Sequence, residues 1–520
     1  MSLGRVPRLD AFLLVLLLVA LGIGMLPLVL AGCCAPAGAT GLGTVWFVND
    51  FAQYEAAMRQ GHDGASWLVR DVFSPEPHRP AFMFSLYVGL GKLAAALNLP
   101  PMTLERPTEV LARGLFVVAL WRFCRAFAVN VAAARAGVLL ALFGSGFELP
   151  AAALGSLLGR SAYVGNWSYE LNSLGLLFAA PHVPLAAAAT LELATSWLRP
   201  RRATLVSLLA AAALGGAIAL LHPFHVPVLL AALGLVGLVY WRTGRGWGTL
   251  VACVIAGLSA LPALLPTIAT FSLDPFWAAT YSVQNLLPSP RPHELLVDLG
   301  PTLVLALGGV LARRGAVAPF GVLMWLLVAV IAMYLPVPYQ RRLSFGAHPA
   351  LALVAGNALV VACASLSRRR ATLLRLSVVA AAASASLVVV VGVLGSVISN
   401  APLPVYRSTA DLDAAATWLE QRTQSGDVVL ADWNVANYLG PRVGQAATFG
   451  GHPVASLHPD DKKLDIATLF AHGGDPELAR QLGVRWLVYG PAEATLGGPA
   501  GQADFSSGAV RVFDVGRRQS

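Results

Sequence analysis

Long apolar runs, separated by short polar segments, constrain the fold of this chain more than any other feature of its sequence. A helix needs about 20 mostly apolar residues to cross the hydrocarbon core of a membrane. The first such run covers residues 11–32, and ten further candidates follow it. These candidates are residues 108–127, 131–147, 176–198, 203–221, 225–241, 248–268, 299–312, 317–335, 347–366 and 372–398. The pattern predicts a mainly α, polytopic transmembrane helical bundle of about eleven spans.

The overall composition agrees with a membrane protein. Of the 520 residues, 57% are hydrophobic and only 12% are charged, and the mean hydropathy is +0.67. Water-soluble chains carry roughly a quarter charged residues. The formal net charge of +9 would fit a nucleic-acid-binding protein only if the positions of the charges were ignored. The arginines form small clusters between the apolar runs, as in cytoplasmic loops of membrane proteins, so we expect no nucleic-acid partner.

The positions of these arginines predict the orientation of the helices. Suppose that the N-terminus is cytoplasmic and that residues 81–97 lie in the outer interface without crossing, with Lys92 turned to the headgroups. All the arginine clusters between spans then fall inside, as the positive-inside rule requires. The clusters are Arg122 and Arg125, Arg199 with Arg201 and Arg202, Arg242 and Arg245, Arg313 and Arg314, and Arg368 to Arg370. The odd number of crossings places the C-terminal segment outside.

The N-terminal run also has a second interpretation. Leu30-Ala31-Gly32-Cys33 matches the bacterial lipoprotein cleavage pattern, so removal of the run and lipidation at Cys33 is an alternative. Apolar regions of signal peptides usually have about 7–15 residues, and this run is longer, so we favour a retained first helix. The five cysteines lie in or beside apolar segments without metal-ligand spacing, which argues against a disulfide framework.

Two domains are expected. Residues 1–400 hold the spans and a first outer loop at residues 33–107, and residues 401–520 form an extracytoplasmic α/β domain. In the second domain, "STADLDAAATWLEQR" has the spacing of an amphipathic helix, with Ser408 or Thr409 as its cap. "DPELARQLGV" predicts another helix, from Asp475 to Gly483. "DVVLA" (427–431), "RWLVYG" and "VRVFDV" are typical of short strands, so we expect a small sheet flanked by helices.

Polar residues gather in the loops that this topology places outside, at residues 33–107, 148–175, 269–298 and 336–346. The candidate site residues in or beside these loops are Asp50, Tyr54, Glu76, Glu148, Glu170, His182, His222, His225, Arg341 and Arg342. Taken alone, each has a simpler explanation, such as a solvated carboxylate, an imidazole bound to a backbone carbonyl or an arginine anchored to lipid headgroups. Their convergence on one membrane face favours a functional site.

The middle parts of the apolar runs contain almost no ionisable residues. Proton- or ion-coupled transporters normally carry such residues or broken helices near the bilayer midplane, so a lipid or polysaccharide transporter is a weaker hypothesis. An enzyme at the outer interface fits better, because a general base there could deprotonate an acceptor hydroxyl and paired arginines could stabilise a departing phosphate. A non-catalytic membrane assembly factor is the third hypothesis.

Several short motifs, taken together, resemble those of a known family. They are Pro181-His182, His222-Pro223 and Gln340-Arg341-Arg342, followed by "GGHPVASLHPDDKKLDIATLF" and "WLVYGPAEATLGG". With an acid in the first outer loop and an outer α/β domain, they make the chain similar to the GT-C superfamily of membrane glycosyltransferases, and most of all to bacterial members with such a domain. The resemblance implies an enzyme of the bacterial cytoplasmic membrane with a polyprenyl-phosphate-linked sugar donor and a glycan, lipid or protein acceptor.

The resemblance also implies roles for the candidate residues. Asp50 would be the catalytic base that activates the acceptor hydroxyl, and a single displacement would invert the sugar's configuration. Arg341 and Arg342 would hold the lipid phosphate. Glu170 would be a second catalytic residue beside Asp50. The remaining candidates would bind substrate, namely Tyr54, Glu76, Glu148, His182, His222 and His225.

The chain departs from the family pattern at Asn49-Asp50, where many members have two adjacent acids. The missing carboxylate weakens the expectation of metal dependence, so a divalent cation is left open as a cofactor, and no nucleotide is expected. It also leaves Glu170 or Glu76 as an alternative catalytic base.

The C-terminal motifs have two interpretations. They either shape an acceptor surface or only form turns and helix caps. The residues concerned are Gly451-His452, Lys462 or Lys463, and Glu493.

Overall fold

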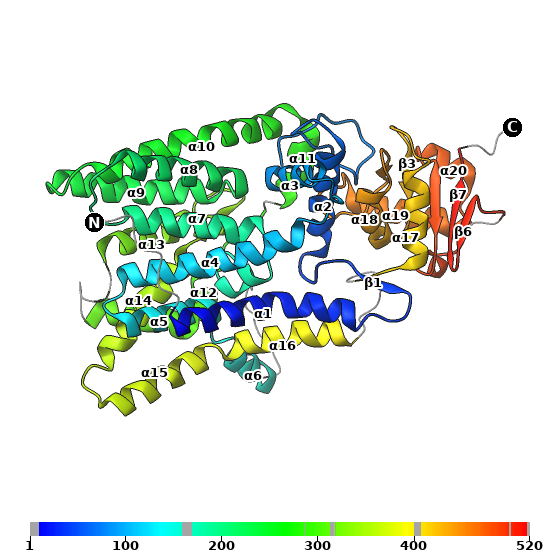
Figure 1. Cartoon of the computed structure of the whole chain (residues 1–520). Helices are drawn as coiled ribbons and strands as arrows, with labels where there is room; N and C mark the ends of the chain where they lie inside the picture. The colour runs from blue at the N-terminus through cyan, green and yellow to red at the C-terminus, as the bar shows by residue number, and fades with distance from the viewer. Residues whose placement is uncertain are drawn as a thin grey trace. The chain divides into compact units, whose positions relative to one another are not determined.

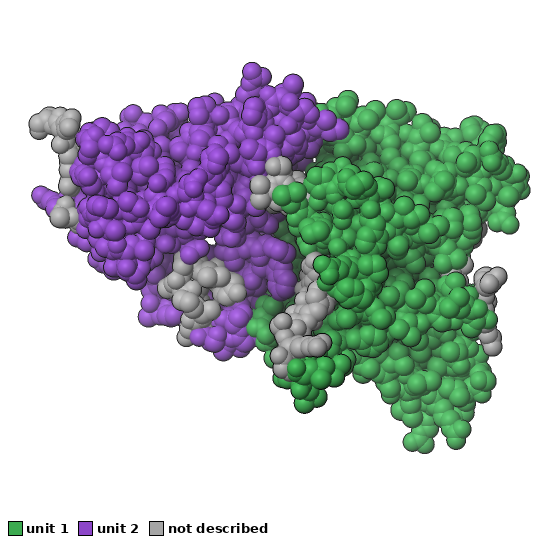
Figure 2. Space-filling model, turned by 180° about the vertical axis from the view of Figure 1, so that it is seen from behind, with its two compact units in different colours: residues 1–25, 107–265, 286–393 green, residues 26–106, 266–285, 394–520 purple. Residues whose placement is uncertain are grey.

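The structure, a computed structural model, describes residues 10–158, 169–284, 286–312, 317, 319–399, 407–498 and 501–516. Arg313, Arg314 and the expected domain boundary at residues 400–401 lie outside the described residues. The chain divides into two compact units, which Figure 2 colours separately. Unit 1 comprises residues 1–25, 107–265 and 286–393, and unit 2 comprises residues 26–106, 266–285 and 394–520.

Unit 1 is built from helices (Figure 1). In chain order they are α1 (Ala11–Cys33), α4 (Glu105–Phe127), α5 (Val131–Phe143), α6 (Glu148–Leu157), the 3₁₀ helix η1 (Ser173–Leu177), α7 (His182–Trp197), α8 (Leu205–Leu221), α9 (His225–Arg242), α10 (Gly248–Leu273), α12 (Pro292–Ala312), α13 (Phe320–Ala332), the 3₁₀ helix η2 (Gln340–Ser344), α14 (Ala347–Ala362), α15 (Arg368–Ala382) and α16 (Ser384–Ile398). One end of each of α1, α4, α10 and α16 belongs to unit 2.

Five helices within the described residues are long and apolar enough to cross a membrane. They are α1, α9, α10, α12 and the stretch Gln340–Ala362, which joins η2 to α14. Two pairs, α5 with α6 and α15 with α16, would each add one span across a 47° bend, and α8 and α13 are apolar but shorter. The mainly helical architecture with membrane-length apolar helices is confirmed. The number of about eleven spans and the orientation of the chain stay predictions.

Helix α4 of unit 1 carries a buried ion pair. In α4, the side chain of Arg113 is only 2% exposed, and its Nη1 lies 3.3 Å from Oε2 of Glu109 one turn earlier. Such a pair is tolerated inside a protein because each charge stabilises the other. The sequence pattern, which showed few ionisable groups inside the apolar runs, did not anticipate this pair.

Helix α14 supports the polar residues of unit 1. It is buried along most of its length, and small residues let α5 approach it closely, since a Cβ on Gly356 would lie 2.5 Å from the backbone nitrogen of Gly137. Such contacts between small residues are usual in membrane helices, where the hydrophobic effect between helices is weak. Asn357 adds two hydrogen bonds, because its Nδ2 donates to Val317 O (2.8 Å) and its Oδ1 accepts from Val129 N (2.9 Å). Helix α14, which follows the η2 turn, is therefore tied to α5 and to the segments that carry Val129 and Val317.

Unit 2 combines short helices with two small sheets (Figure 1). In chain order its elements are β1 (Ala39–Gly41), α2 (Val48–Asp63), α3 (Ser85–Ala96), α11 (Pro275–Gln284), β2 (Arg407–Thr409), α17 (Ala410–Glu420), β3 (Val428–Leu430), α18 (Trp433–Leu439), η3 (Gly440–Arg442), β4 (Ala447–Thr448), α19 (Pro459–Ala471), α20 (Pro476–Gln481), β5 (Trp486–Tyr489), η4 (Glu493–Thr495), β6 (Phe505–Ser507) and β7 (Val510–Asp514).

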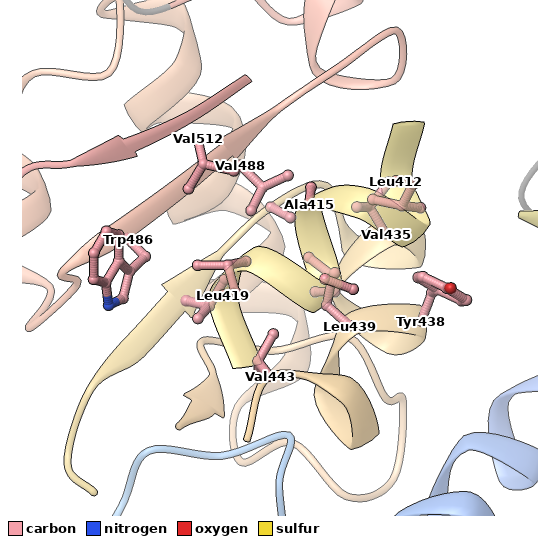
Figure 3. Packing of buried hydrophobic residues seen from close by; sticks show 14 of the residues in the cluster. Leu412, Ala415, Leu419, Val435, Tyr438, Leu439, Val443, Trp486, Val488 and Val512 are labelled. Carbon is pink, nitrogen blue, oxygen red and sulfur yellow. The ribbon is translucent and has the colours of Figure 1, made fainter. Parts of the chain in front are cut away.

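The larger sheet has five strands in the order β4-β3-β5-β7-β6. β3 pairs in parallel with β4 and β5, whereas β7 pairs antiparallel with β5 and β6. One face packs on α17 and α18 through a cluster that includes Leu419, Leu439 and Val488 (Figure 3). The other face packs on α19 and α20 through Leu430, Phe470 and other residues. Burial on both faces explains the continuous apolar sequence of β3, and the expected C-terminal sheet with flanking helices is confirmed.

The first loop, residues 33–107, packs within unit 2 against the C-terminal sheet domain. β1 pairs antiparallel with β2, and Val72 O accepts a hydrogen bond from Thr448 N (2.8 Å). Buried Glu55 of α2 forms an ion pair with Arg442 of η3 at 2.5 Å. The contacts thus group the first loop with the C-terminal residues, and the division into domains 1–400 and 401–520 stays a prediction.

The stretch 81–97, expected to lie in the membrane interface, contains α3. Helix α3 packs so closely on α2 that a Cβ on Gly91 would lie 2.0 Å from Met58 O. Lys92 Nζ donates to Gly64 O (2.9 Å) and lies 5.6 Å from the centre of the Trp67 ring. The interfacial position of this helix stays a prediction.

Candidate functional site

Asp50 stands on the first turn of α2, in unit 2. A carboxylate is favoured at this position because the N-terminal end of a helix is electropositive. The side chain is 29% exposed, and its Oδ1 lies 3.6 Å from Nε2 of His452, whose side chain is completely buried. Gln53, one turn further along α2, reaches the same imidazole from the other side, with its Nε2 3.3 Å from Nδ1. We call Asp50, Gln53 and His452 the Asp50 cluster.

Glu76 lies on the first loop and is already paired with a cation. Lys462 Nζ is 2.6 Å from Glu76 Oε1, and the side chain of Lys462 is only 6% exposed. Burial lowers the pKa of Lys462, and the carboxylate of Glu76 raises it in part. Lys462 also lies over the Phe449 ring, 5.4 Å from its centre. Glu76 of the first loop and Lys462 of α19, which the sequence analysis named separately, therefore meet in the folded chain.

Asp71 lines a small cleft in unit 2 together with Gln53, Trp277 and Tyr281. Its Oδ1 accepts a hydrogen bond from Phe73 N (2.7 Å). Burial raises the pKa of the Asp71 carboxyl to about 8. Burial also raises the pKa of the Tyr281 phenol, and the charges of Asp71 and Asp50 add to that effect, so both acids act on the same phenol.

Tyr54 contributes its ring to packing in unit 2. It stacks on Tyr87 with a centroid distance of 4.3 Å and meets Phe84 edge-on at 5.6 Å. These contacts account for the aromatic ring at this position, and a role in substrate binding stays a prediction.

Unit 1 holds a second group of candidate residues. Glu170 is 3% exposed, and its Oε2 lies 3.7 Å from Nε of Arg341 on η2. Arg342 Nη1 donates to Tyr169 Oη (3.5 Å), and its guanidinium lies 5.0 Å from the centre of the Phe224 ring. Two neighbouring arginines of one 3₁₀ turn therefore contact the segment that precedes η1.

Three imidazole rings lie close to one another in the same unit. His222, where α8 ends, lies 4.2 Å from His225 and 6.3 Å from His182 between ring centroids, and 6.3 Å from the Tyr169 ring. His225 stacks on Phe345, which follows η2. Both ring nitrogens of His222 and Nε2 of His225 are buried and make no hydrogen bond to any described residue. We call Glu170, His182, His222, His225, Arg341 and Arg342 the Glu170 cluster.

Glu148 lies at a different place in unit 1. It begins α6, beside the kink that α12 makes at Gly300 (φ +31°). Phe147 N donates to Val297 O (2.6 Å), so this turn is tied to α12. Its predicted role in substrate binding stays a prediction.

The described part of the chain contains no evident metal-binding site. No group of three or more His, Cys, Asp or Glu side chains there is arranged to hold a metal ion.

The sequence also carried signals that the prediction did not use. Gln53 is three residues after Asp50, so both side chains lie on one face of α2. His348, on α14, accepts from Ser173 N (3.3 Å) and lies 3.0 Å from Ser173 Oγ, and it belongs to another His-Pro pair like His222-Pro223. No local signal, by contrast, indicated that Asp71 is partly buried, because the residues around it come from distant segments.

Comparison with solved structures identifies the fold. The chain matches a structure of the archaeal oligosaccharyltransferase AglB from Archaeoglobus fulgidus in complex with an inhibitory peptide and a dolichol-phosphate. The match has a TM-score of 0.50 and 14% sequence identity, and it covers 92% of this chain and 69% of that one. Two other structures of the Archaeoglobus fulgidus enzyme also match. One is tethered to an acceptor peptide with the NVT sequon, with a TM-score of 0.49 and 13% identity over 93% of this chain and 69% of that one. The other, in complex with Zn and sulfate, has a TM-score of 0.45 and 14% identity over 91% and 67%.

No protein-family profile matches the chain, and no curated protein has significant sequence similarity to it. The chain shares the fold of the archaeal oligosaccharyltransferase, a GT-C family glycosyltransferase, so the resemblance noted in the sequence is confirmed at the level of fold.

Proposed function

We propose that this protein is a membrane glycosyltransferase that transfers a sugar from a polyprenyl-phosphate-linked donor to an acceptor at the outer face of the membrane. The fold shared with a lipid- and peptide-binding oligosaccharyltransferase supports this proposal. The observation that carries it is the Glu170 cluster. Two guanidinium groups, a carboxylate and three imidazole rings meet there among otherwise apolar helices, and several of their buried nitrogens lack a hydrogen-bond partner among the described residues.

The Glu170 cluster has the chemistry to bind a lipid phosphate. Guanidinium groups bind phosphate oxygens through paired, charge-assisted hydrogen bonds, and they keep their charge when partly buried. Arg341 now lies 3.7 Å from Glu170, a long contact that an incoming phosphate could replace or share. The unpaired nitrogens of His222 and His225 would then find partners on the phosphate or the sugar hydroxyls.

The Asp50 cluster has the chemistry to activate an acceptor. Asp50 is partly exposed, so an acceptor hydroxyl can reach its carboxylate. In the proposed step, the acceptor oxygen forms a bond to the anomeric carbon while the bond from that carbon to the phosphate oxygen breaks. The bonding electron pair leaves with the phosphate, and the hydroxyl proton moves to Asp50. A single displacement of this kind inverts the configuration of the sugar.

The two alternative bases are less suited to this role. Glu76 is held by Lys462 at 2.6 Å, and Glu170 is buried beside Arg341. The ammonium of Lys462 already occupies one oxygen of Glu76, and Glu170 is only 3% exposed, so an acceptor hydroxyl has less access to either carboxylate than to Asp50. We therefore assign the catalytic base to Asp50.

The donor assignment can be tested by native mass spectrometry of the protein purified in mild detergent. We expect a co-purifying polyprenyl phosphate or its sugar adduct, and we expect its loss from the Arg341→Ala/Arg342→Ala variant. Arg242→Ala/Arg245→Ala removes a pair of arginines from the end of α9 and the loop after it, which is predicted to face inside, and should retain the lipid. Equal retention by all three proteins, or no lipid on any of them, would overturn the phosphate assignment and favour the assembly factor.

The acceptor assignment needs a transfer assay with synthetic polyprenyl-phosphate hexoses and alkyl hexoside acceptors. A positioned general base contributes about 10²–10⁴-fold to rate, so Asp50→Asn should lower transfer by about a hundredfold or more. Asp63→Asn, at the other end of α2 with a 70% exposed side chain, is the matched control and should stay active. Unchanged transfer by Asp50→Asn would refute this assignment.

A further inference from the structure

His452 is held in one orientation by contacts to one of its two ring nitrogens. Its Nδ1 lies 3.2 Å from Val454 N and 3.0 Å from Ala455 N. The Gln53 amide nitrogen approaches the same atom at 3.3 Å. The ring also packs on Phe73, with a centroid distance of 5.3 Å. These contacts leave the imidazole little freedom to turn.

The residue before His452 shows why the turn has this shape. Gly451 has φ +115°, and a Cβ there would lie 2.6 Å from Asn437 N. Glycine is the residue that adopts this backbone conformation without strain and allows such a close approach to α18. The turn that carries His452 therefore packs closely against α18 of the C-terminal sheet domain.

The hydrogen bonds to Nδ1 determine which nitrogen carries the proton. A backbone N–H can only donate, so Nδ1 must accept from Val454 and Ala455 and is unprotonated. The neutral ring then carries its proton on Nε2. That Nε2 is buried and makes no hydrogen bond to a described residue, and Asp50 Oδ1 lies 3.6 Å from it. A small movement of the partly exposed Asp50 side chain would complete the hydrogen bond.

We propose that His452 is a positioning residue for Asp50, with its Nε2–H directed at Asp50 Oδ1 so that Oδ2 faces the acceptor. This inference rests on the proposed function, in which Asp50 is the catalytic base. During transfer the acceptor proton goes to Oδ2, while His452 stays neutral and keeps its own proton. A fixed carboxylate has less orientational freedom to lose when the acceptor arrives.

The two ring nitrogens have separable tasks, which makes the proposal testable. Nδ1 holds the turn together, whereas Nε2 contributes nothing to the turn. His452→Asn keeps an acceptor oxygen near the position of Nδ1 but loses the donor toward Asp50. His452→Gln places an amide nitrogen near the position of Nε2 and keeps that donor.

In the hexose-transfer assay, His452→Asn should lower kcat by about ten- to a hundredfold, as misplaced catalytic groups do. The KM for the lipid-linked donor should not change, and His452→Gln should recover most of kcat. Thermal midpoints show whether each variant is folded. Full activity of His452→Asn, or equal loss in both folded variants, would overturn the proposal and leave a purely structural role.

A second measurement does not depend on activity. The nitrogen-15 NMR spectrum of the full-length protein with labelled histidine reports the tautomer, and subtraction of the His452→Asn spectrum identifies the signal. We expect the Nε2–H tautomer, with an Nε2 signal that moves in Asp50→Ala while the Nδ1 signal stays. An Nδ1–H tautomer, or an Nε2 signal indifferent to Asp50, would overturn the contact. If the wild type transfers no sugar, the proposed function fails, and this spectrum still decides whether His452 positions Asp50.

Discussion

The stability of unit 2 should depend on pH through one partly buried acid, Asp71. Burial raises the pKa of this carboxyl from 3.8 to about 8, although the hydrogen bond from Phe73 N and the charge of Lys462 act in the opposite direction. Between these two pKa values the folded chain keeps a proton that the unfolded chain has released. The resulting stabilisation is complete below the unfolded pKa and is lost progressively as the pH rises toward about 8.

The size of the change in the free energy of unfolding follows from the difference in the number of protons bound by the folded and unfolded states. One extra proton on the folded state lowers the free energy of unfolding by about 1.4 kcal/mol for each pH unit of increase. From pH 5 to pH 7 the loss through Asp71 alone is about 2–3 kcal/mol. Above a pH of about 8 both states have released the proton, so the curve should become level.

The variant that isolates this effect is Asp71→Asn. The amide keeps an acceptor oxygen for Phe73 N but cannot ionise. We would measure the thermal midpoint by tryptophan fluorescence in mild detergent from pH 5 to pH 9. The wild type should lose stability relative to the variant as the pH rises, since groups common to both proteins cancel in the difference.

Asp460→Asn serves as the control, because its side chain is 94% exposed on α19. Its midpoints should follow those of the wild type at every pH. Parallel curves for the wild type and Asp71→Asn would refute the reasoning, because they would mean that Asp71 binds no extra proton in the folded protein.

Three other substitutions, one of them with a matched glycine control, give independent tests of the packing. Arg442→Met removes one of the cations that contact the buried carboxylate of Glu55. In a denaturant titration the free energy of unfolding should fall by about 3 kcal/mol, which is the lower end of the range for a broken buried ion pair. Gly451→Ala should lower the free energy of unfolding by about 1–3 kcal/mol, because the new Cβ clashes with α18 and alanine is strained at this positive φ. Gly38→Ala, at φ +78° with nothing within 4 Å of its Cβ, should cost less in the same titration. His222→Leu removes a buried ring that makes no hydrogen bond to the described residues. The free energy of unfolding should stay equal or rise by about 1 kcal/mol, while native mass spectrometry should detect less bound lipid.

Some features of the fold were predictable because their signals are local. The apolar runs 11–32 and 225–241 are long enough to span a membrane, and the structure has membrane-length helices there. Thr409 caps α17 by accepting from Leu412 N (3.2 Å), as the preference of hydroxyl side chains for helix N-termini suggests. The apolar run of β3 likewise reports its burial between two layers of helices.

The candidate site was only partly predictable. The sequence singled out both Asp50 and His452, but it contained no information that they meet. Gln53 and His452 approach each other across 399 residues of chain. The contacts of Glu493 match the simpler of its two interpretations, in which it stabilises a turn. Its carboxylate accepts hydrogen bonds from Gly490 N (2.8 Å) and Asp432 N (2.7 Å).

The sequence by itself determined that this chain is a bundle of apolar helices with a small C-terminal sheet domain. Length, apolarity and periodicity act over a few turns of chain, so they can be evaluated without knowing the partners of a segment. Only the tertiary structure decided that the first loop packs on the C-terminal sheet domain, that Lys462 holds Glu76, and that the proton of His452 faces Asp50. The pKa of a carboxyl and the direction of an imidazole proton depend on neighbours that come from distant segments, and folding alone brings those neighbours together.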